Sequence, residues 1–253
     1  MKNLLIIMML CMLASCVQTN GGSSKRYKDS DSQAEPEDSY AMLNVKMGVA
    51  YFERGSQGKD KYANYNIALE KFKRALVHNP KLAIAHSGIA TVYSAMNAKV
   101  DAARHYKLSV KHAPDDPVIL NNYGTFLCQT GKYLEAVEYY KKTLANPFYR
   151  TPETVHENAG VCLMRAGEHQ QAEVHFREAL ASNPKMAISL YNMVIISAGK
   201  NDSMAARAFI QRLDGLMALD EKVLKIAYQV EKKMGNDRAA NQYLAELRKI
   251  KKS

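Results

Sequence analysis

Four cysteines and seven histidines are the side chains of this 253-residue chain that are best suited to chemistry. The histidines are scattered along the sequence, and no nucleophile or oriented acid accompanies any of them. The sequence contains no Gly-rich phosphate loop and no HExxH, GxSxG or CxxC motif. Without a CxxC or a nearby histidine pair, the cysteines make a poor metal site. We therefore expect a protein that is not an enzyme and needs no metal or diffusible cofactor.

The first sixteen residues read as an export signal that ends in a cysteine. Lys2 supplies a positive start, ten apolar residues follow from Leu4 to Leu13, and Ala14-Ser15 provides small residues for cleavage. Ten residues are too few to span a bilayer, which takes roughly 20. Leu13-Ala14-Ser15-Cys16 resembles the lipobox, which implies that Cys16 becomes the lipidated first residue. The alternative is an ordinary signal with an incidental cysteine.

Cysteine counting then leaves two thiols in the mature chain. Cys11 leaves with the signal and Cys16 carries lipid, so Cys128 and Cys162 remain in a compartment that permits disulfides. A Cys128–Cys162 bridge is our hypothesis. Loss of Lys2 lowers the formal net charge from +10 to +9. A basic exported chain suits acidic protein partners or anionic lipid rather than nucleic acid, although the charge can also serve solubility alone.

The chain after the signal divides into a tether and a repeat domain. The stretch after Cys16 contains Gly21-Gly22-Ser23-Ser24, mixed charge and Pro36, and it lacks apolar periodicity. We assign residues 1–15 to the signal peptide, 16–39 to a flexible lipid-anchored linker and 40–253 to the repeat domain.

The repeat domain shows the 34-residue period of tetratricopeptide repeats. Counted from the first residue of each repeat, small residues fall at registers 8, 20 and 27 and aromatic or large ones at 11 and 24, as in Gly160, Ala172, Ala179, Leu163 and Phe176. The fold class is all-α, a right-handed superhelical solenoid of about six repeats of antiparallel helix pairs, with twelve helices and no strand. The repeats begin at Ala41, Ala83, Pro117, Glu153, Ala187 and Glu221.

Local signals refine this pattern. Gly131, Gly167 and Gly235 share register 15, where a left-handed turn would end the first helix of a repeat. The first repeat holds eight extra residues within Gly55–Tyr65, which we assign to a longer turn. The third repeat holds two extra residues near Asn146-Pro147-Phe148. Two of the histidines, His86 and His156, share register 4 and are interpreted as inter-helix or groove residues.

A more specific sequence pattern occurs in the third and fourth repeats. Asn121-Asn122-Tyr123-Gly124-Thr125-Phe126-Leu127-Cys128, the segment Ala145–Glu153 and the segment Glu157–Cys162 resemble the pilotin-type lipoproteins of type IV pilus systems, the PilF/PilW family. The resemblance implies an outer-membrane lipoprotein that helps the secretin to localise, oligomerise or remain stable. Val17 after Cys16 is compatible with outer-membrane sorting. Cys128 and Cys162 match family positions in adjacent first helices, where α-carbons within about 7 Å can be bridged.

First helices of such repeats line a concave groove through registers 2, 5, 9, 12 and 13. Amide side chains there can hydrogen-bond a peptide main chain, and apolar ones can anchor its side chains. Alternatively, part of the apolar set packs against the linker or the next helix. The groove ends in a basic set, Lys222, Lys225, Lys232 and Lys233. The predicted groove residues are Met42, Val45, Val49, Phe52, Ile84, Ser87, Thr91, Ser94, Asn121, Thr125, Gln129, Glu157, Val161 and Arg165.

The leading functional hypothesis is a non-enzymatic scaffold for the type IV pilus secretin. It would be a monomer, anchored in the outer membrane by lipid on Cys16 and facing the periplasm, with a secretin subunit as partner and neither nucleic acid nor a small-molecule substrate. The alternative is a lipoprotein cofactor that activates a cell-wall-synthesising enzyme through the same groove.

Overall fold

The computed structural model describes residues 36–58 and 60–250. The predicted signal peptide, the lipidation site Cys16 and the linker up to Glu35 lie outside the described residues. The helices belong to one unit, Ala34–Ser253. Within the described residues no helix is both long and apolar enough to cross a membrane.

The described residues form twelve α-helices and no strand, as predicted. The first residues of α3, α5, α9 and α11 coincide with the predicted repeat starts, and that of α7 lies one residue earlier. The helices are α1 Pro36–Ser56, α2 Lys61–His78, α3 Ala83–Ala95, α4 Lys99–His112, α5 Pro117–Gln129, α6 Tyr133–Leu144, α7 Pro152–Ala166, α8 His169–Ser182, α9 Ala187–Gly199, α10 Ser203–Asp214, α11 Glu221–Lys233 and α12 Asp237–Ile250.

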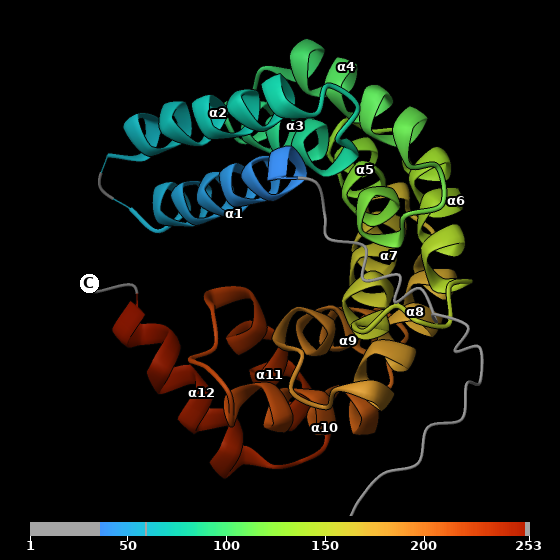
Figure 1. Cartoon of the computed structure of the whole chain (residues 1–253). Helices are drawn as coiled ribbons and strands as arrows, with labels where there is room; N and C mark the ends of the chain where they lie inside the picture. The colour runs from blue at the N-terminus through green and yellow to red at the C-terminus, as the bar shows by residue number, and fades with distance from the viewer. Residues whose placement is uncertain (1–35, 59, 251–253) are drawn as a thin grey trace, which may run out of the picture. The chain divides into compact units, whose positions relative to one another are not determined.

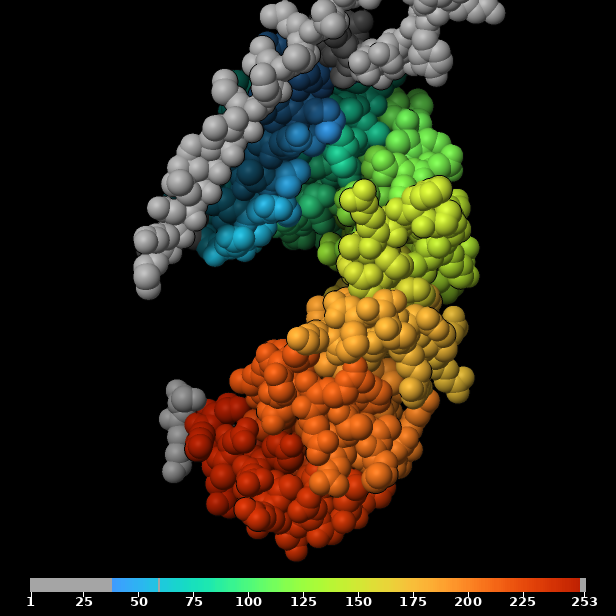
Figure 2. Space-filling model, turned by 60° about the horizontal axis from the view of Figure 1, so that its bottom comes forward, coloured from blue at the N-terminus to red at the C-terminus, as the bar shows by residue number. Residues whose placement is uncertain are grey.

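Each odd-numbered helix packs against the even-numbered helix that follows it, and the pairs stack in chain order (Figure 1). Odd-numbered helices also touch one another, as α3 touches α5 and α7 touches α9, whereas no two even-numbered helices of the described unit are in contact. Taken by itself, this unit is hollowed along one side in the space-filling view (Figure 2). The odd-numbered helices therefore form the continuous layer on which a groove can be built.

Small residues at register 8 let an aromatic ring of the partner helix come close. A Cβ on Gly160 would lie 2.6 Å from the Phe176 ring, and one on Gly124 would lie 3.0 Å from the Tyr140 ring. Both rings are fully buried. The ring at register 24 thus fills the space that glycine leaves at register 8, and this pairing explains the repeat pattern physically.

Left-handed residues follow five of the six odd-numbered helices at register 15; the exception is α1, where Gly55 is still helical. Gly131, Gly167 and Gly235 have φ between 74° and 86°, as predicted. Asn97 and Asn201 take the same register in α3 and α9 with φ of 61° and 59°. Asparagine is one of the few residues besides glycine that tolerates this conformation, so the turn geometry is uniform although the residue type is not.

The first repeat differs from the prediction of a longer turn within Gly55–Tyr65. Most of the extra residues lengthen the helices instead: α1 continues to Ser56, 16 residues from the repeat start at Ala41, and α2 has 18 residues, against 13 and 14 in α3 and α4. Tyr65 in the added turn of α2 is buried, stacks on Phe52 at 5.4 Å and lies over Gly55. Burial of this ring favours continued helix over an exposed loop. Helix α1 also begins at Pro36, inside the segment assigned to the linker.

The two extra residues of the third repeat lie where they were predicted. Helix α6 ends at Leu144 and α7 begins at Pro152, which leaves a connection longer than the four residues between α4 and α5. Phe148 projects from this connection and is 88% exposed.

Candidate functional site

Two adjoining hollows lie on the odd-numbered helices α1, α3, α5 and α7, where the groove was predicted. The larger has a volume of about 470 Å³ and a lining that is about equally polar and apolar, and the smaller has a volume of about 160 Å³ and a mainly apolar lining. Phe52 and Thr91 line both. The other predicted residues that line them are Val45, Val49, Ile84, Ser87, Ser94, Asn121, Thr125 and Gln129.

Polar side chains on the groove surface link consecutive odd-numbered helices. Between α3 and α5, Asn122 donates to Ser87 at 3.4 Å and Ser94 donates to Gln129 at 3.2 Å. Between α5 and α7, Asn158 donates to Asn121 at 3.2 Å. These bonds run across the repeats, so they fix the spacing of the groove side chains from one repeat to the next.

Each of these amides uses one end for its inter-repeat bond. Asn121 and Gln129 accept through their oxygens and retain their NH₂ groups, whereas Asn122 and Asn158 donate and retain their oxygens. The larger hollow therefore presents donors and acceptors side by side. This is the combination that a peptide main chain requires, because each residue of a peptide carries one N–H and one C=O.

Tyrosine hydroxyls lie beneath this polar surface. Tyr106 lies 3.0 Å from the Thr91 hydroxyl, and Tyr140 donates to Thr125 at 3.3 Å. Burial raises the pKa of Tyr106 and raises that of Tyr140 to about 12. Both phenols therefore stay protonated at neutral pH and hold the two threonines in place.

The smaller hollow supplies an apolar end. Val49 is 42% exposed at its edge, and Phe52 and Ile84 are half-buried. Val45 also lines it but is only 4% exposed and belongs to the core formed with Tyr65, Phe72 and Ile89. Val45 is thus mainly a packing residue, which agrees with the alternative that part of the apolar set packs within the domain. Val49 and Phe52 are available to a ligand.

Four predicted groove residues do not line either hollow. Met42 is exposed on α1, and Arg165 is exposed near the end of α7. Val161 packs against the C-terminal core. Glu157 accepts hydrogen bonds from the Ser189 amide and hydroxyl at 2.9 and 2.8 Å, so its carboxylate is engaged in joining α7 to α9.

The basic end of the predicted groove is largely engaged within the unit. Lys225 pairs with Glu221 at 2.6 Å and Lys232 with Asp237 at 2.5 Å. Lys222 lies 6.0 Å from the centre of the Tyr191 ring. Both ion pairs join exposed side chains, and Lys233 is exposed as well, so these contacts position the lysines on the surface of α11 without burying them.

The register rule missed several residues of the larger hollow. Asn122 and Asn158 share register 6, which is not one of the groove registers, and Tyr106 and Phe126 reach the hollow from beneath. The recurrence of asparagine at register 6 in consecutive repeats was a usable signal. Tyr106 and Phe126 gave no such signal, because tyrosine and phenylalanine are also the usual residues at core positions of these repeats.

Cys128 in α5 and Cys162 in α7 are joined by a disulfide, with α-carbons 5.6 Å apart. This is the pair that cysteine counting left. Both residues are buried within the central core cluster. The bond links two consecutive odd-numbered helices that both contribute side chains to the larger hollow.

Two histidine pairs recur at the same registers of the second and fourth repeats. The Nδ1 atoms of His86 and His105 are 3.1 Å apart, and so are those of His156 and His175. Burial lowers the pKa of each, and that of His105 to about 4. Among the described residues no group of three or more His, Cys, Asp or Glu is arranged to hold a metal ion. The pairs therefore join helices, which agrees with the inter-helix interpretation of His86 and His156.

No family model matches the chain. The type IV pilus assembly protein PilF of Pseudomonas aeruginosa is 24% identical over 193 residues, which cover 75% of this chain and 71% of PilF.

Solved structures give the same relatives. The structure of Pseudomonas aeruginosa PilF matches with a TM-score of 0.78 and 21% identity, covering 85% of this chain and 94% of that one. The crystal structure of PilW, described as a widely conserved type IV pilus biogenesis factor, matches with a TM-score of 0.70 and 24% identity, covering 82% and 91%. The resemblance drawn from residues 121–162 is thereby confirmed: this chain is homologous to PilF and has the tetratricopeptide repeat fold of PilF and PilW.

Proposed function

We propose that this protein supports type IV pilus biogenesis by binding a segment of the secretin in the groove on its odd-numbered helices. It acts by binding rather than by catalysis. Lipid on Cys16 anchors it in the outer membrane, and the stretch after Cys16 tethers the repeat unit on the periplasmic side. The homology to PilF and the fold shared with PilW support the pilus role.

The observation that carries the proposal is the pairing of an apolar hollow with one that is rich in amide side chains. Val49, Phe52 and Ile84 offer contacts for apolar side chains. Asn121, Asn158 and their neighbours offer unused amide donors and acceptors for a main chain. An extended segment with an apolar end satisfies both.

A groove that holds rather than transforms its ligand has a clear use next to a membrane. A lipid-tethered binder confines its client to the volume that the tether can reach, which raises the effective concentration of client subunits at one surface. Subunits collected in this way meet one another more often, and this favours assembly of a ring.

Site-specific photocrosslinking in cells tests the groove. A photoreactive residue at Val49, Thr125 or Gln129 should crosslink to the secretin subunit, whereas one at Val174, which is 59% exposed on the even-numbered helix α8, should not. Equal crosslinking from Val174, or capture of a cell-wall enzyme instead, would contradict the proposal.

Genetics tests the role. Deletion of the gene should reduce assembled secretin multimers and pili, and Cys16→Ala should reduce multimers while leaving the protein folded. Normal multimers and normal piliation after complete deletion would refute the secretin role.

A further inference from the structure

A second hollow, larger than those of the groove, lies between α4 and α5. Its volume is about 880 Å³. Tyr123, Phe126 and Leu127 of α5 form its floor, and Val100, Ala103 and Leu108 of α4 form an apolar wall. None of these residues was predicted as part of a binding surface.

One small side chain keeps this hollow open. Ala103 is the fifth residue of α4, and the fifth residues of α6, α8 and α10 are Val137, Glu173 and Arg207. Val137 is buried in the core, and Arg207 pairs with the buried Glu231 at 3.0 Å. Alanine is the shortest of the four; it packs beside the α5 cluster of Tyr123, Phe126 and Leu127 but has no polar group that could form an ion pair across the junction.

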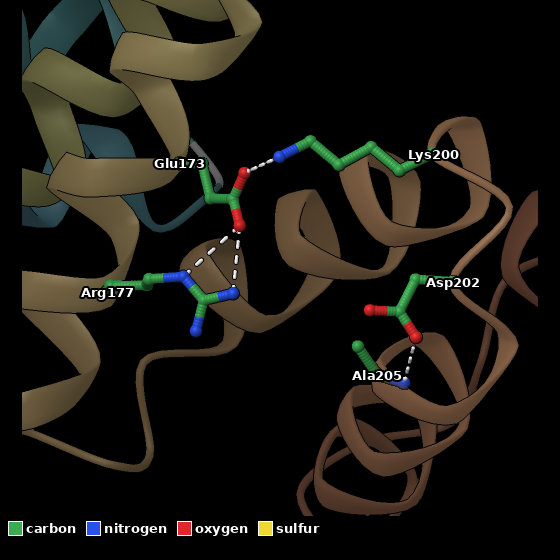
Figure 3. A network of polar contacts seen from close by, with 5 residues as sticks. All are labelled: Glu173, Arg177, Lys200, Asp202 and Ala205. Atoms are coloured by element: carbon green, nitrogen blue, oxygen red, sulfur yellow. Dashed lines mark hydrogen bonds and ion pairs between the residues drawn. The ribbon is translucent and has the colours of Figure 1, made fainter.

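The junction between the fourth and fifth repeats shows how the same space is closed elsewhere. There Glu173 forms ion pairs with Arg177, at 2.8 Å, and with Lys200 at the end of α9 (Figure 3). Lys200 follows the last residue of α9 as Thr130 follows the last residue of α5. Ala103 and Thr130 therefore occupy the positions that are equivalent to Glu173 and Lys200 in the junction between the fourth and fifth repeats. Instead of forming an ion pair there, both residues line the open hollow.

Cations surround the apolar floor. Lys99, Arg104, Lys107, Lys111 and Lys132 line the hollow. Arg104 pairs with Asp101 at 2.6 Å and Lys132 with Glu135 at 3.3 Å. Among the described residues, Lys99, Lys107 and Lys111 form no ion pair, so three positive charges on one wall lack a counter-charge.

The spacing of these lysines indicates the shape of the ligand. Lys99 and Lys111 lie twelve residues apart on α4, which corresponds to about 18 Å along the helix axis. A row of that length matches about three turns of a partner helix. The floor lies below the cations, so it accepts apolar side chains that project from such a helix.

We propose that this hollow is a second docking site, which binds an amphipathic helix of a protein partner that carries apolar residues on one face and acidic residues beside it. The apolar face contacts Phe126, Leu127 and the wall of α4, and the acidic residues pair with Lys99, Lys107 and Lys111. The site shares Phe126 with the larger hollow of the groove but lies between α4 and α5, and it does not rest on the function proposed for that groove.

A model peptide tests the site on the purified full-length protein. The probe is a fluorescein-labelled peptide of about 15 residues, long enough to form helix on binding, with leucine on one face and glutamate elsewhere. The control peptide has lysine in place of every glutamate. Fluorescence anisotropy should show binding of the glutamate peptide, weakening as salt is raised, and no binding of the lysine peptide.

Matched variants assign the binding to this hollow. Ala103→Leu fills it with an aliphatic side chain comparable to Val137, and Lys107→Glu/Lys111→Glu reverses its charge; each should weaken binding about tenfold or more. Lys81→Glu/Lys185→Glu makes the same charge change at exposed lysines elsewhere and should leave binding unchanged.

The proposal is overturned if the glutamate peptide does not bind, if the lysine peptide binds equally, or if the control pair weakens binding as much as Lys107→Glu/Lys111→Glu. It is also overturned if phosphatidylglycerol vesicles bind through these lysines while the peptide does not, because the occupant is then a membrane. The charge variants lie on the exposed surface, so they remain informative if Ala103→Leu impairs folding. Thr125→Lys in the other groove should not alter peptide binding.

Discussion

The disulfide between Cys128 and Cys162 makes a quantitative prediction about stability. The two cysteines are 34 positions apart and join α5 to α7. In the chain-entropy model, a cross-link closing a loop of this length removes enough freedom from the unfolded chain to stabilise the native state by roughly 3–4 kcal/mol. Cleavage of this bond should therefore lower the free energy of unfolding of the central repeats by about that amount.

The measurement compares oxidised and reduced wild-type protein, because reduction removes the bond and leaves both side chains in place. Urea unfolding followed by circular dichroism gives the shift in midpoint. Repeat arrays can unfold in steps, so hydrogen exchange of the amides in α5 and α7 should report the local loss. The double variant Cys128→Ala/Cys162→Ala controls for the reductant, whose addition should leave that variant unchanged.

Two results would refute this reasoning. If oxidised wild-type protein contains both thiols free by mass measurement, the bond does not form. If the bond forms but reduction changes neither the urea midpoint nor exchange in α5 and α7, the loop entropy is offset by strain or by structure in the unfolded chain.

The remaining predictions concern the core, acid sensitivity and a buried ion pair. Phe176→Ala empties a fully buried site and should cost about 3–5 kcal/mol in denaturant unfolding; a loss below 1 kcal/mol would show that the repeats collapse around the gap. Burial lowers the pKa of His86 and His105 below the ordinary value of 6.5, so these imidazoles take up protons in the unfolded chain at a higher pH than in the folded protein. The free energy of unfolding should therefore fall by about 1 kcal/mol between pH 7 and pH 5, after allowance for solvent screening. An unchanged pH profile in the double variant His86→Gln/His105→Gln would contradict this. Arg207→Ala leaves the Glu231 carboxylate buried without its partner and should cost roughly 2–4 kcal/mol by thermal unfolding, whereas Arg207→Lys should cost less.

The repeat pattern predicted much of the fold because its signals are local. Gly160 and Phe176 lie in one helix pair, and Gly167 acts within its own turn, so a 34-residue template contains both partners of each contact. The lengthened helices of the first repeat lay outside that template. Spacing alone could not distinguish a loop from added helix, since the outcome depends on where Tyr65 is buried.

The candidate site was predicted less completely, because its residues meet across repeats. Glu157 has a groove register, yet its partner Ser189 comes from the next repeat and takes its carboxylate out of the groove. The hollow on α4 depends on Ala103 and on Thr130 of the following repeat together. A register rule describes one repeat at a time and does not contain such pairs. Lipidation at Cys16 stays a prediction.

The restriction of contacts to neighbouring helices has a consequence for the order in which the chain matures. Helices of the described unit touch only partners close in sequence, so each repeat can complete its core as soon as the next has emerged from the ribosome or from an export channel. The two bridged cysteines lie in consecutive repeats, and the segments that bring them together end at Ala166. Oxidation can thus secure the middle of the array before α9 to α12 exist as structure. Premature termination after the fourth repeat should yield a fragment that is already cross-linked.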